Sequence, residues 1–278
     1  MLGFSSRKEF SIGFNQDVLQ RNIAVYENLT DEIAMNVGLL LNCVEMKTRY
    51  GNSLLPVNEL NSQSESIPPF ITTETPFRLF LETFISEDSS YASTHYLQQL
   101  DLHAHLPELI QDAGILPFLP HVLSDGRISE SECHEPTLFI GKKGIKTSLH
   151  FDRCGKAGYS SKSDPGKFNL FHQISGKRRF ILFPPELTDY FEPMENTDTP
   201  HVSKSTTFLH SVPVEMSEEQ QIDYLSRSPF PKLAEIWRKR REIILQPGET
   251  ILISPRWWHC TELIESGTAL NWWFSYSS

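Results

Sequence analysis

The chain has 278 residues, enough to bury a sizeable core, and a single barrel with extensions commonly reaches roughly 250 residues. Its 35 Asp and Glu residues outnumber 25 Lys and Arg, and the formal net charge of −10 argues against charge-driven binding to nucleic acid or to anionic membranes. The run Arg238–Arg241 is a local exception, which we interpret as a solvated basic face.

The sequence also lacks the signals of secretion or of a membrane span. The longest apolar run, Val37–Leu41, is far shorter than the roughly 18 residues that a spanning helix needs. Residues 1–10 carry charge but no long apolar segment, so they do not resemble a signal peptide. The cysteines are scattered and form no CxxC pair: Cys43, Cys133, Cys154 and Cys260. We therefore expect a soluble, reduced, cytoplasmic protein.

Helical patterns dominate the first part of the chain. Apolar residues at helical spacing predict a helix over residues 29–50, and the polar stretch 58–66 is typical of a loop. Thr75 as N-cap, with Pro76 at the first helical position, predicts the start of a second helix. We expect residues 1–90 to form a mostly helical extension that packs on a catalytic barrel made by residues 91–278.

A short strand is predicted around Tyr96, with Gln98 on the same face because strand side chains alternate. The pair His103-Ala-His105 precedes a helical pattern and has no acidic partner at strand spacing. We interpret it as structural, and the Cys133-His134 pair in an acidic, Ser-rich loop likewise.

Beyond residue 137 the sequence changes to short strands separated by turn residues, which is typical of a barrel or sandwich. The predicted strands span residues 137–141, 147–152, 168–174, 177–183, 249–253 and 268–274. Two insertions interrupt them. Residues 153–167 are rich in Gly, Ser and Lys and indicate a mobile surface loop, and residues 186–242 are polar and Pro-broken, with one helix expected from the cap Ser217 to Leu225.

One predicted strand sets an imidazole and a carboxylate on the same face. His150 and Asp152 are two residues apart, so both can reach one ion while Phe151 points away. A third ligand must come from elsewhere, and His259, after two tryptophans, is the best candidate. Two histidines and one carboxylate are the donor set of non-haem Fe(II) sites with open positions for oxygen and a co-substrate. The adjacent Cys260 is interpreted as a packing residue.

The surroundings of this triplet make it specific. It is followed by a strand running from Gly176-Lys-Arg-Arg to Leu-Phe-Pro-Pro, and later by a Pro-Gly-Glu strand ending in Trp-Trp-His259. In this order the motifs resemble the Jumonji-C (cupin-like) family of Fe(II)- and 2-oxoglutarate-dependent oxygenases, and within it the asparaginyl hydroxylases. The resemblance implies a mainly β fold with α additions: a double-stranded β-helix, or jelly-roll, core with N-terminal helices and an inserted helical connection.

The resemblance also implies roles for individual residues. His150, Asp152 and His259 match the metal triad. Thr147 and Tyr96 match residues that contact 2-oxoglutarate, and Asn169 and Asn271 match amides that line its pocket. Gln98 and Trp273 would lie on the substrate side.

The sequence departs from the family where the distal carboxylate of the co-substrate is anchored. The family has Lys two residues after the strand-opening Gly, and this chain has Arg178 there. Lys177 is one residue early, and strand alternation directs it to the opposite face. Arg178 keeps the positive charge and can bind a carboxylate through two parallel hydrogen bonds. Two alternatives follow: the pocket is reshaped around 2-oxoglutarate, or it binds another acid. The insertion after Asp152 is the second departure, and we expect it to lie over the site mouth.

The resemblance therefore implies a dioxygenase that uses Fe(II), O2 and 2-oxoglutarate, releases succinate, and hydroxylates a carbon of a protein or peptide side chain. Two alternatives remain open. A lid-like insertion would favour an oxygenase of the same type acting on a small metabolite, and the third candidate is a non-catalytic metal-binding cupin module. A long open groove would favour a peptide substrate, and a closed pocket a metabolite. Neither nucleic acid nor membrane is an expected partner.

Overall fold

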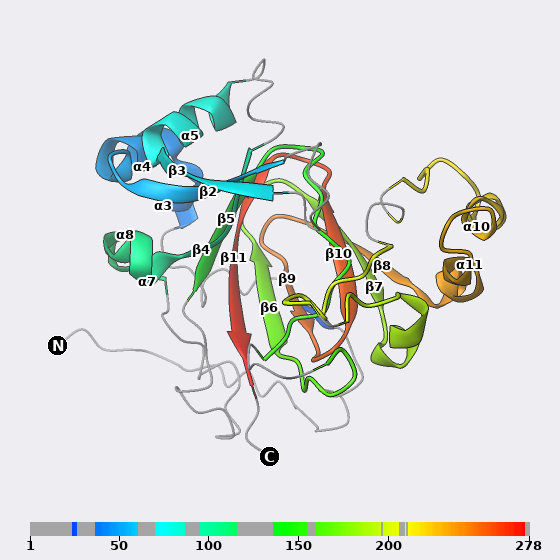
Figure 1. The fold of residues 1–278 in the computed structure, drawn as a ribbon. Coiled ribbons are helices and arrows are strands. Elements are labelled where there is room, and N and C mark those ends of the chain that lie inside the picture. The colour runs from blue at the N-terminus through cyan, green and yellow to red at the C-terminus, as the bar shows by residue number, and fades with distance from the viewer. Residues whose placement is uncertain are drawn as a thin grey trace, which may run out of the picture.

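Two antiparallel β-sheets form the centre of the protein in the computed structural model (Figure 1). The structure describes residues 24–26, 37–60, 70–86, 95–115, 136–154, 160–195, 197–205, 209 and 211–275. The large sheet has eight strands, in the order β1 (Ala24–Tyr26), β9 (Thr250–Ile253), β6 (Phe168–Gln173), β11 (Gly267–Phe274), β5 (Thr137–Gly141), β4 (His95–Asp101), β2 (Leu54–Leu60) and β3 (Phe70–Pro76). The small sheet has the order β10 (Trp258–Leu263), β7 (Arg178–Phe183), β8 (Arg241–Leu245).

Irregular segments extend the small sheet beyond β10. His150 forms isolated bridges with His259 on one side and with Val202 on the other, and Pro193 bridges Ser203. The facing sheets and these bridges make the predicted mainly β, jelly-roll core.

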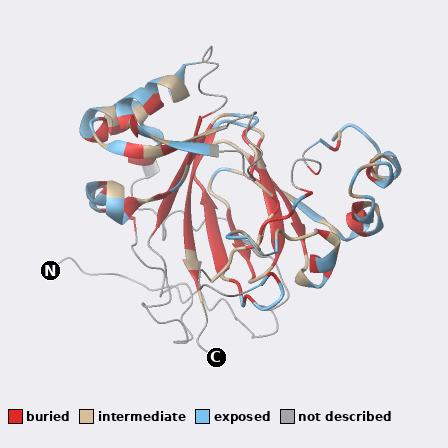
Figure 2. Ribbon diagram, in the orientation of Figure 1, coloured by how far each residue is buried: buried red, intermediate tan, exposed pale blue. Residues whose placement is uncertain are grey.

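The inner faces of the two sheets enclose one hydrophobic cluster. Phe139, Phe171 and Ile251 come from the large sheet, and Phe180 and Leu182 come from β7. Because strand side chains alternate, the neighbouring residues point outward and build two further cores. The strands are accordingly the most buried part of the protein (Figure 2).

Helices cover the outer faces. On the large-sheet side lie α3 (Val37–Leu41), α4 (Cys43–Tyr50), α5 (Phe77–Ile85), α7 (Leu102–His105) and α8 (Pro107–Ala113), whose apolar residues share a core with Leu138 and Leu170. On the other side, η2 (Pro185–Tyr190), α10 (Glu218–Ser226), α11 (Lys232–Ile236) and η3 (Trp237–Lys239) pack over Ile181 and Trp258. Within the described ranges, none of these helices has the length and apolarity to cross a membrane.

The N-terminal region differs from its expected helical character because it contributes three strands, β1, β2 and β3, to the large sheet. Asn58 and Glu59 belong to β2 and not to a loop, since β2 pairs with β3 along all seven of its residues. The same pairing runs to Pro76 and keeps Thr75 extended, so the second helix begins at Phe77 with Pro76 as its N-cap. The first predicted helix is observed as α3 and α4, and residues 29–36 lie outside the described part.

The C-terminal half follows the predicted strands, with three corrections. Residues 147–152 form isolated bridges instead of a regular strand. The strands predicted at 249–253 and 268–274 lie on either side of β6 and do not pair with each other. His259 does not end the first of these strands, because a turn at Arg256, with φ of +64°, separates β9 from β10. The sequence did not predict β10 or β8.

Two smaller predictions concern the segment between β7 and β8. The helix capped by Ser217 is confirmed, and Ser217 and Gln220 form a reciprocal capping box. The basic run is partly neutralised, because Arg238 and Arg240 each pair with Glu218 of α10. These ion pairs agree with a solvated structural face.

Candidate active site

The three predicted metal ligands meet at one edge of the small sheet. His150 and His259 exchange two backbone hydrogen bonds, of 3.0 and 2.7 Å, which fix their segments side by side. Their ring centroids are 4.4 Å apart. One ligand atom from each of His150, Asp152 and His259 lies within 4.8 Å of the others.

Backbone carbonyls fix which nitrogen each imidazole presents. Nδ1 of His150 lies 2.7 Å from the Ser148 carbonyl, and Nδ1 of His259 lies 3.0 Å from the Trp257 carbonyl. A carbonyl only accepts, so Nδ1 carries the proton and the Nε2 lone pair is left for an ion. The two Nε2 atoms lie 4.0 and 3.6 Å from oxygens of the Asp152 carboxylate. The donor set therefore converges on one point.

Electrostatics keep this set ready for a cation. Burial, followed by the proximity of His259, lowers the pKa of His150 to about 4. At neutral pH this imidazole is uncharged, as a metal ligand must be. Two imidazoles and one carboxylate suit a divalent transition metal such as Fe(II).

The two predicted asparagines support Asp152. The Asn169 amide donates to Oδ2 of Asp152 at 2.9 Å, and the Asn271 amide donates to the side-chain oxygen of Asn169. The Thr137 hydroxyl lies 3.3 Å from the side-chain oxygen of Asn271. This chain of amides fixes the rotation of the carboxylate: Asn169 contacts the triad directly, and Asn271 acts on it through Asn169.

Arg178 is buried between the sheets, with 2% of its surface exposed. Its guanidinium lies 4.9 Å from the ring centre of Phe171 and 5.9 Å from those of Phe139 and Tyr96. Nη1 donates to the Tyr96 hydroxyl at 3.1 Å and to Oγ1 of Thr261 at 3.0 Å. Among the described residues, Nε and Nη2 are buried and have no partner.

Strand alternation separates the two candidate cations as predicted. Lys177 is exposed and pairs with Glu265 at 2.6 Å, whereas Arg178 points between the sheets. Gly141 faces Tyr96 across the β4–β5 pair, and a Cβ there would come within 2.8 Å of the tyrosine ring. The glycine thus leaves room for the ring beside Arg178. Burial raises the pKa of Tyr96, so its phenol stays protonated.

Thr147 and Thr261 complete this end of the cavity. Their hydroxyls lie 3.1 Å apart, and the Thr261 backbone N–H donates to Oγ1 of Thr147 at 2.9 Å. Thr147 was predicted from the resemblance, whereas no role in this pocket was predicted for Thr261. The only sequence signal was its position two residues after His259, on the same strand face.

The two predicted substrate-side residues lie apart. Gln98 accepts a hydrogen bond of 3.3 Å from Asn58, which pairs with Tyr96, so Gln98 lies on the Tyr96 face as expected. Trp273 pairs with Asn169 across β11 and β6, and its indole nitrogen is buried with no partner in the described part of the chain.

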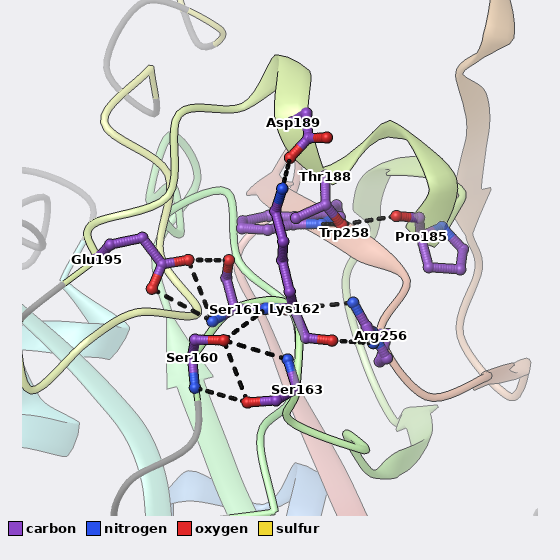
Figure 3. Close-up of polar contacts among 10 residues, drawn as sticks. All are labelled: Ser160, Ser161, Lys162, Ser163, Pro185, Thr188, Asp189, Glu195, Arg256 and Trp258. Atoms are coloured by element: carbon purple, nitrogen blue, oxygen red, sulfur yellow. Dashed lines mark hydrogen bonds and ion pairs between the residues drawn. The ribbon is translucent and has the colours of Figure 1, made fainter.

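The loop that follows Asp152 is tethered in its described part (Figure 3). Arg256 donates to the carbonyls of Lys162 and Ser161 at 2.7 and 3.2 Å. Glu195 accepts from the backbone and hydroxyl of Ser161, and Lys162 pairs with Asp189 at 2.7 Å. Side chains outside the predicted mobile loop therefore bind the backbone of its described part, at Ser161 and Lys162.

The loop returns directly to the second ligand. The Lys167 N–H donates to the Asp152 carbonyl at 2.8 Å. Gly166, with φ of +72°, packs so closely against the β9–β10 turn that a Cβ there would lie 2.7 Å from the backbone nitrogen of Arg256. Residues 160–167 therefore form one wall beside the triad, and residues 155–159 lie outside the described part.

Within the described part of the chain, the other histidine and cysteine candidates contribute no ligand to this centre. His103 and His105 lie on α7 and, among the described residues, join no metal-binding cluster. Cys260 packs in the outer core, and burial raises the pKa of its thiol to about 12. The interpretation of Cys260 as a packing residue is confirmed. Cys133 and His134 lie outside the described residues.

Comparison with known families agrees with this geometry. Residues 41–278 match the cupin-like domain. The chain belongs to the cupin-like, Jumonji-C family. The match begins inside the segment expected to be an N-terminal extension, in agreement with the strands found there.

Three relatives illustrate the range of this family. The chain is 25% identical over 199 residues to "Lysine-specific demethylase JMJ30" of Arabidopsis thaliana (72% of this chain, 38% of the relative). It is 25% identical over 271 residues to "HSPB1-associated protein 1 homolog" of Danio rerio (92% and 52%). It is 27% identical over 200 residues to "tRNA wybutosine-synthesizing protein 5" of Danio rerio (68% and 47%). The chain spans about half, or less, of these relatives.

Proposed function

We propose that this protein is an Fe(II)- and 2-oxoglutarate-dependent dioxygenase that hydroxylates a carbon of a protein or peptide side chain and releases succinate. The observation that carries the proposal is the pairing of two features that β10 joins, because His259 and the Arg178 partner Thr261 lie two residues apart on this strand. One is a convergent His150–Asp152–His259 donor set, and the other is a buried guanidinium with unpartnered donors. A metal site alone would also fit a storage or metal-binding module, whereas the buried Arg178 guanidinium indicates that a carboxylate ligand binds as well.

In this proposal, His150, Asp152 and His259 hold the iron, which when bound would supply the activation of O2. Three protein ligands leave the remaining positions of an octahedron open. Asn169 and Asn271 hold the Asp152 carboxylate in a fixed rotation, and the Ser148 and Trp257 carbonyls do the same for the imidazoles. The surrounding aromatic side chains exclude water from the reacting groups.

The distal carboxylate of 2-oxoglutarate would bind Arg178. Its charge is buried among Phe139, Phe171 and Tyr96, and a buried guanidinium without an anion is strongly unfavourable. Tyr96 contacts Arg178 directly, and Thr147 is linked to Arg178 through Thr261, which supports the same anchor. Their hydroxyls are suited to further hydrogen bonds with that carboxylate.

The substrate class rests on weaker support than the cofactors. The indole N–H of Trp273 is buried, has no partner among the described residues and would suit a carbonyl of either substrate class, so the peptide assignment rests on the resemblance to the asparaginyl hydroxylases. Residues 160–167 return to Asp152, whose carbonyl accepts from the Lys167 N–H, and a lid-like segment at this position would favour the alternative, a small metabolite. The named relatives act on different classes of molecule by their names, so they favour neither.

Succinate formation tests the proposal directly. We expect the Fe(II)-loaded protein to convert 2-oxoglutarate to succinate slowly without a prime substrate. Arg178→Ala should reduce this turnover at least tenfold at low 2-oxoglutarate, by loss of a charge-assisted pair. Equal turnover in both proteins would rule out Arg178 as the anchor. Wild-type protein that binds Fe(II) but turns over no 2-oxoglutarate would favour the non-catalytic metal-binding module.

A further inference from the structure

The hydrogen bonds of Arg178 leave one particular edge of its guanidinium unused. A guanidinium has five N–H groups, and two of them, on Nη1, are taken by Tyr96 and Thr261. The atoms without partners among the described residues are Nε and Nη2. These two nitrogens lie on the same edge of the planar group, and their N–H bonds run parallel. A carboxylate binds such an edge through both of its oxygens.

Thr261 decides which edge is left over. Its Oγ1 accepts from Nη1 at 3.0 Å and lies 3.1 Å from Oγ1 of Thr147, and the residue is almost completely buried. Phe171 lies over the guanidinium, so rotation within the plane is the freedom that remains. Two acceptors on Nη1, one from β4 and one from β10, oppose that rotation.

We infer that Thr261 is a positioning residue for co-substrate specificity: it holds the Nε/Nη2 edge of Arg178 ready for the distal carboxylate of a dicarboxylic 2-oxo acid. The inference rests on the proposed function. Thr261 follows His259 by two residues on β10, so the strand that provides a metal ligand also orients the acid anchor. A lysine in place of Arg178 presents three rotatable donors and no planar edge, and would gain little from such an acceptor.

The test measures binding, not turnover. The full chain is loaded with Mn²⁺, a redox-inert substitute under these conditions, and titrated calorimetrically with 2-oxoglutarate and with 2-oxopentanoate. The second ligand has the same chain length but a methyl group in place of the distal carboxylate. In wild type we expect 2-oxoglutarate to bind at least tenfold more tightly.

Thr261→Val keeps the shape of the side chain and removes the acceptor. We expect it to weaken 2-oxoglutarate about tenfold and to leave 2-oxopentanoate unchanged, while Thr261→Ser stays within about twofold of wild type. In protein that already carries Arg178→Lys, Thr261→Val should weaken 2-oxoglutarate binding by a further factor of less than about two, because the guanidinium that Thr261 positions is no longer present.

Each outcome bears on one claim. Equal weakening of both ligands, or an undiminished effect of Thr261→Val in the Arg178→Lys background, would show a merely structural role and overturn the inference. Equal affinity of the wild-type protein for 2-oxoglutarate and 2-oxopentanoate would instead show that Arg178 does not anchor the distal carboxylate, and would contradict that part of the proposed function. Circular dichroism checks folding, and Thr261→Ala serves as a second variant. An unchanged preference in either folded variant overturns the inference.

Discussion

At the scale of single residues, the carboxylate of Asp152 is held by a hydrogen-bonded amide chain. Asn169 donates to its Oδ2, so one lone-pair region of that oxygen is fixed by the protein. Such a contact orients a ligand before the ion arrives and reduces the conformational freedom that binding would otherwise remove. Replacing the amide therefore tests whether the pocket asparagines act on the metal site.

We predict that Asn169→Ala weakens Fe(II) binding by roughly 10- to 100-fold, the range typical of groups that orient metal ligands. The measurement is competition with a metal chelator under anaerobic conditions. Asn58→Ala is the matched control, since Asn58 is also a strand asparagine that donates to a side chain, but to Gln98 instead of a ligand. Equal affinities in the two variants would contradict the assigned role.

The residues that could be predicted were those defined by short spacing. His150, Asp152 and the opposed faces of Lys177 and Arg178 follow from strand alternation within one segment. Thr261 could not be found in that way, because its contacts join it to Thr147 and Arg178, 114 and 83 residues away in the chain. Such contacts depend on strand register, which composition and periodicity do not fix.

At the scale of elements, the loop over residues 160–167 is attached to the β9–β10 turn. Arg256 makes this attachment from a left-handed backbone conformation, which disfavours most side chains, and its guanidinium binds two loop carbonyls. The loop also carries the backbone N–H that binds the Asp152 carbonyl. Loss of the attachment should therefore loosen the loop and the wall beside the triad.

We predict that Arg256→Asn raises amide hydrogen exchange in residues 160–167 while lowering stability by only about 1–2 kcal/mol, because Asn tolerates the left-handed backbone and two hydrogen bonds are lost. Mass spectrometry of exchanged peptides measures the first effect. Arg227→Asn is the control: its pair with Asp223 is highly exposed and should contribute below about 1 kcal/mol, with no change in the loop. Unchanged exchange in Arg256→Asn would mean that the Arg256 contacts do not hold the loop.

The elements missed from the sequence have a common physical reason. β10 is buried on both faces except at Glu262, so the alternation that marks a half-buried strand is hidden. β8 is an edge strand with exposed charged residues, and β2 contains Pro56 and Asn58, which disfavour strands locally. In each case pairing with a distant strand overrides the local preference. The helix capped by Ser217 was found because its signal is local.

At the scale of the whole molecule, one buried and two half-buried histidines make stability depend on pH. Burial is the largest cause that lowers the pKa of His150, His172 and His201 to about 4. The unfolded chain takes up these protons between about pH 6.5 and 4, whereas the folded chain does not. Stability is therefore fully present above about pH 6.5 and falls as the pH decreases through this window.

His172 allows the effect to be isolated away from the metal ligands. It is fully buried, with Nδ1 2.9 Å from the Thr250 hydroxyl. We predict that wild type loses about 2 kcal/mol more stability than His172→Gln between pH 7 and pH 5, since the imidazole titrates and the amide does not. Urea unfolding at both pH values measures this difference. Parallel losses in the two proteins would contradict the burial argument.

The central claim is that one cavity holds both Fe(II) and a dicarboxylic 2-oxo acid. Anaerobic titration of the full chain with Fe(II) and then 2-oxoglutarate tests it most directly, by the weak visible absorption band of a 2-oxo acid chelated to Fe(II). We predict that the band appears only when both are present, is abolished in His259→Ala and Asp152→Ala, and requires higher 2-oxoglutarate in Arg178→Ala. Wild-type protein that retains Fe(II) but develops no band with 2-oxoglutarate, or that retains no Fe(II), would contradict the account.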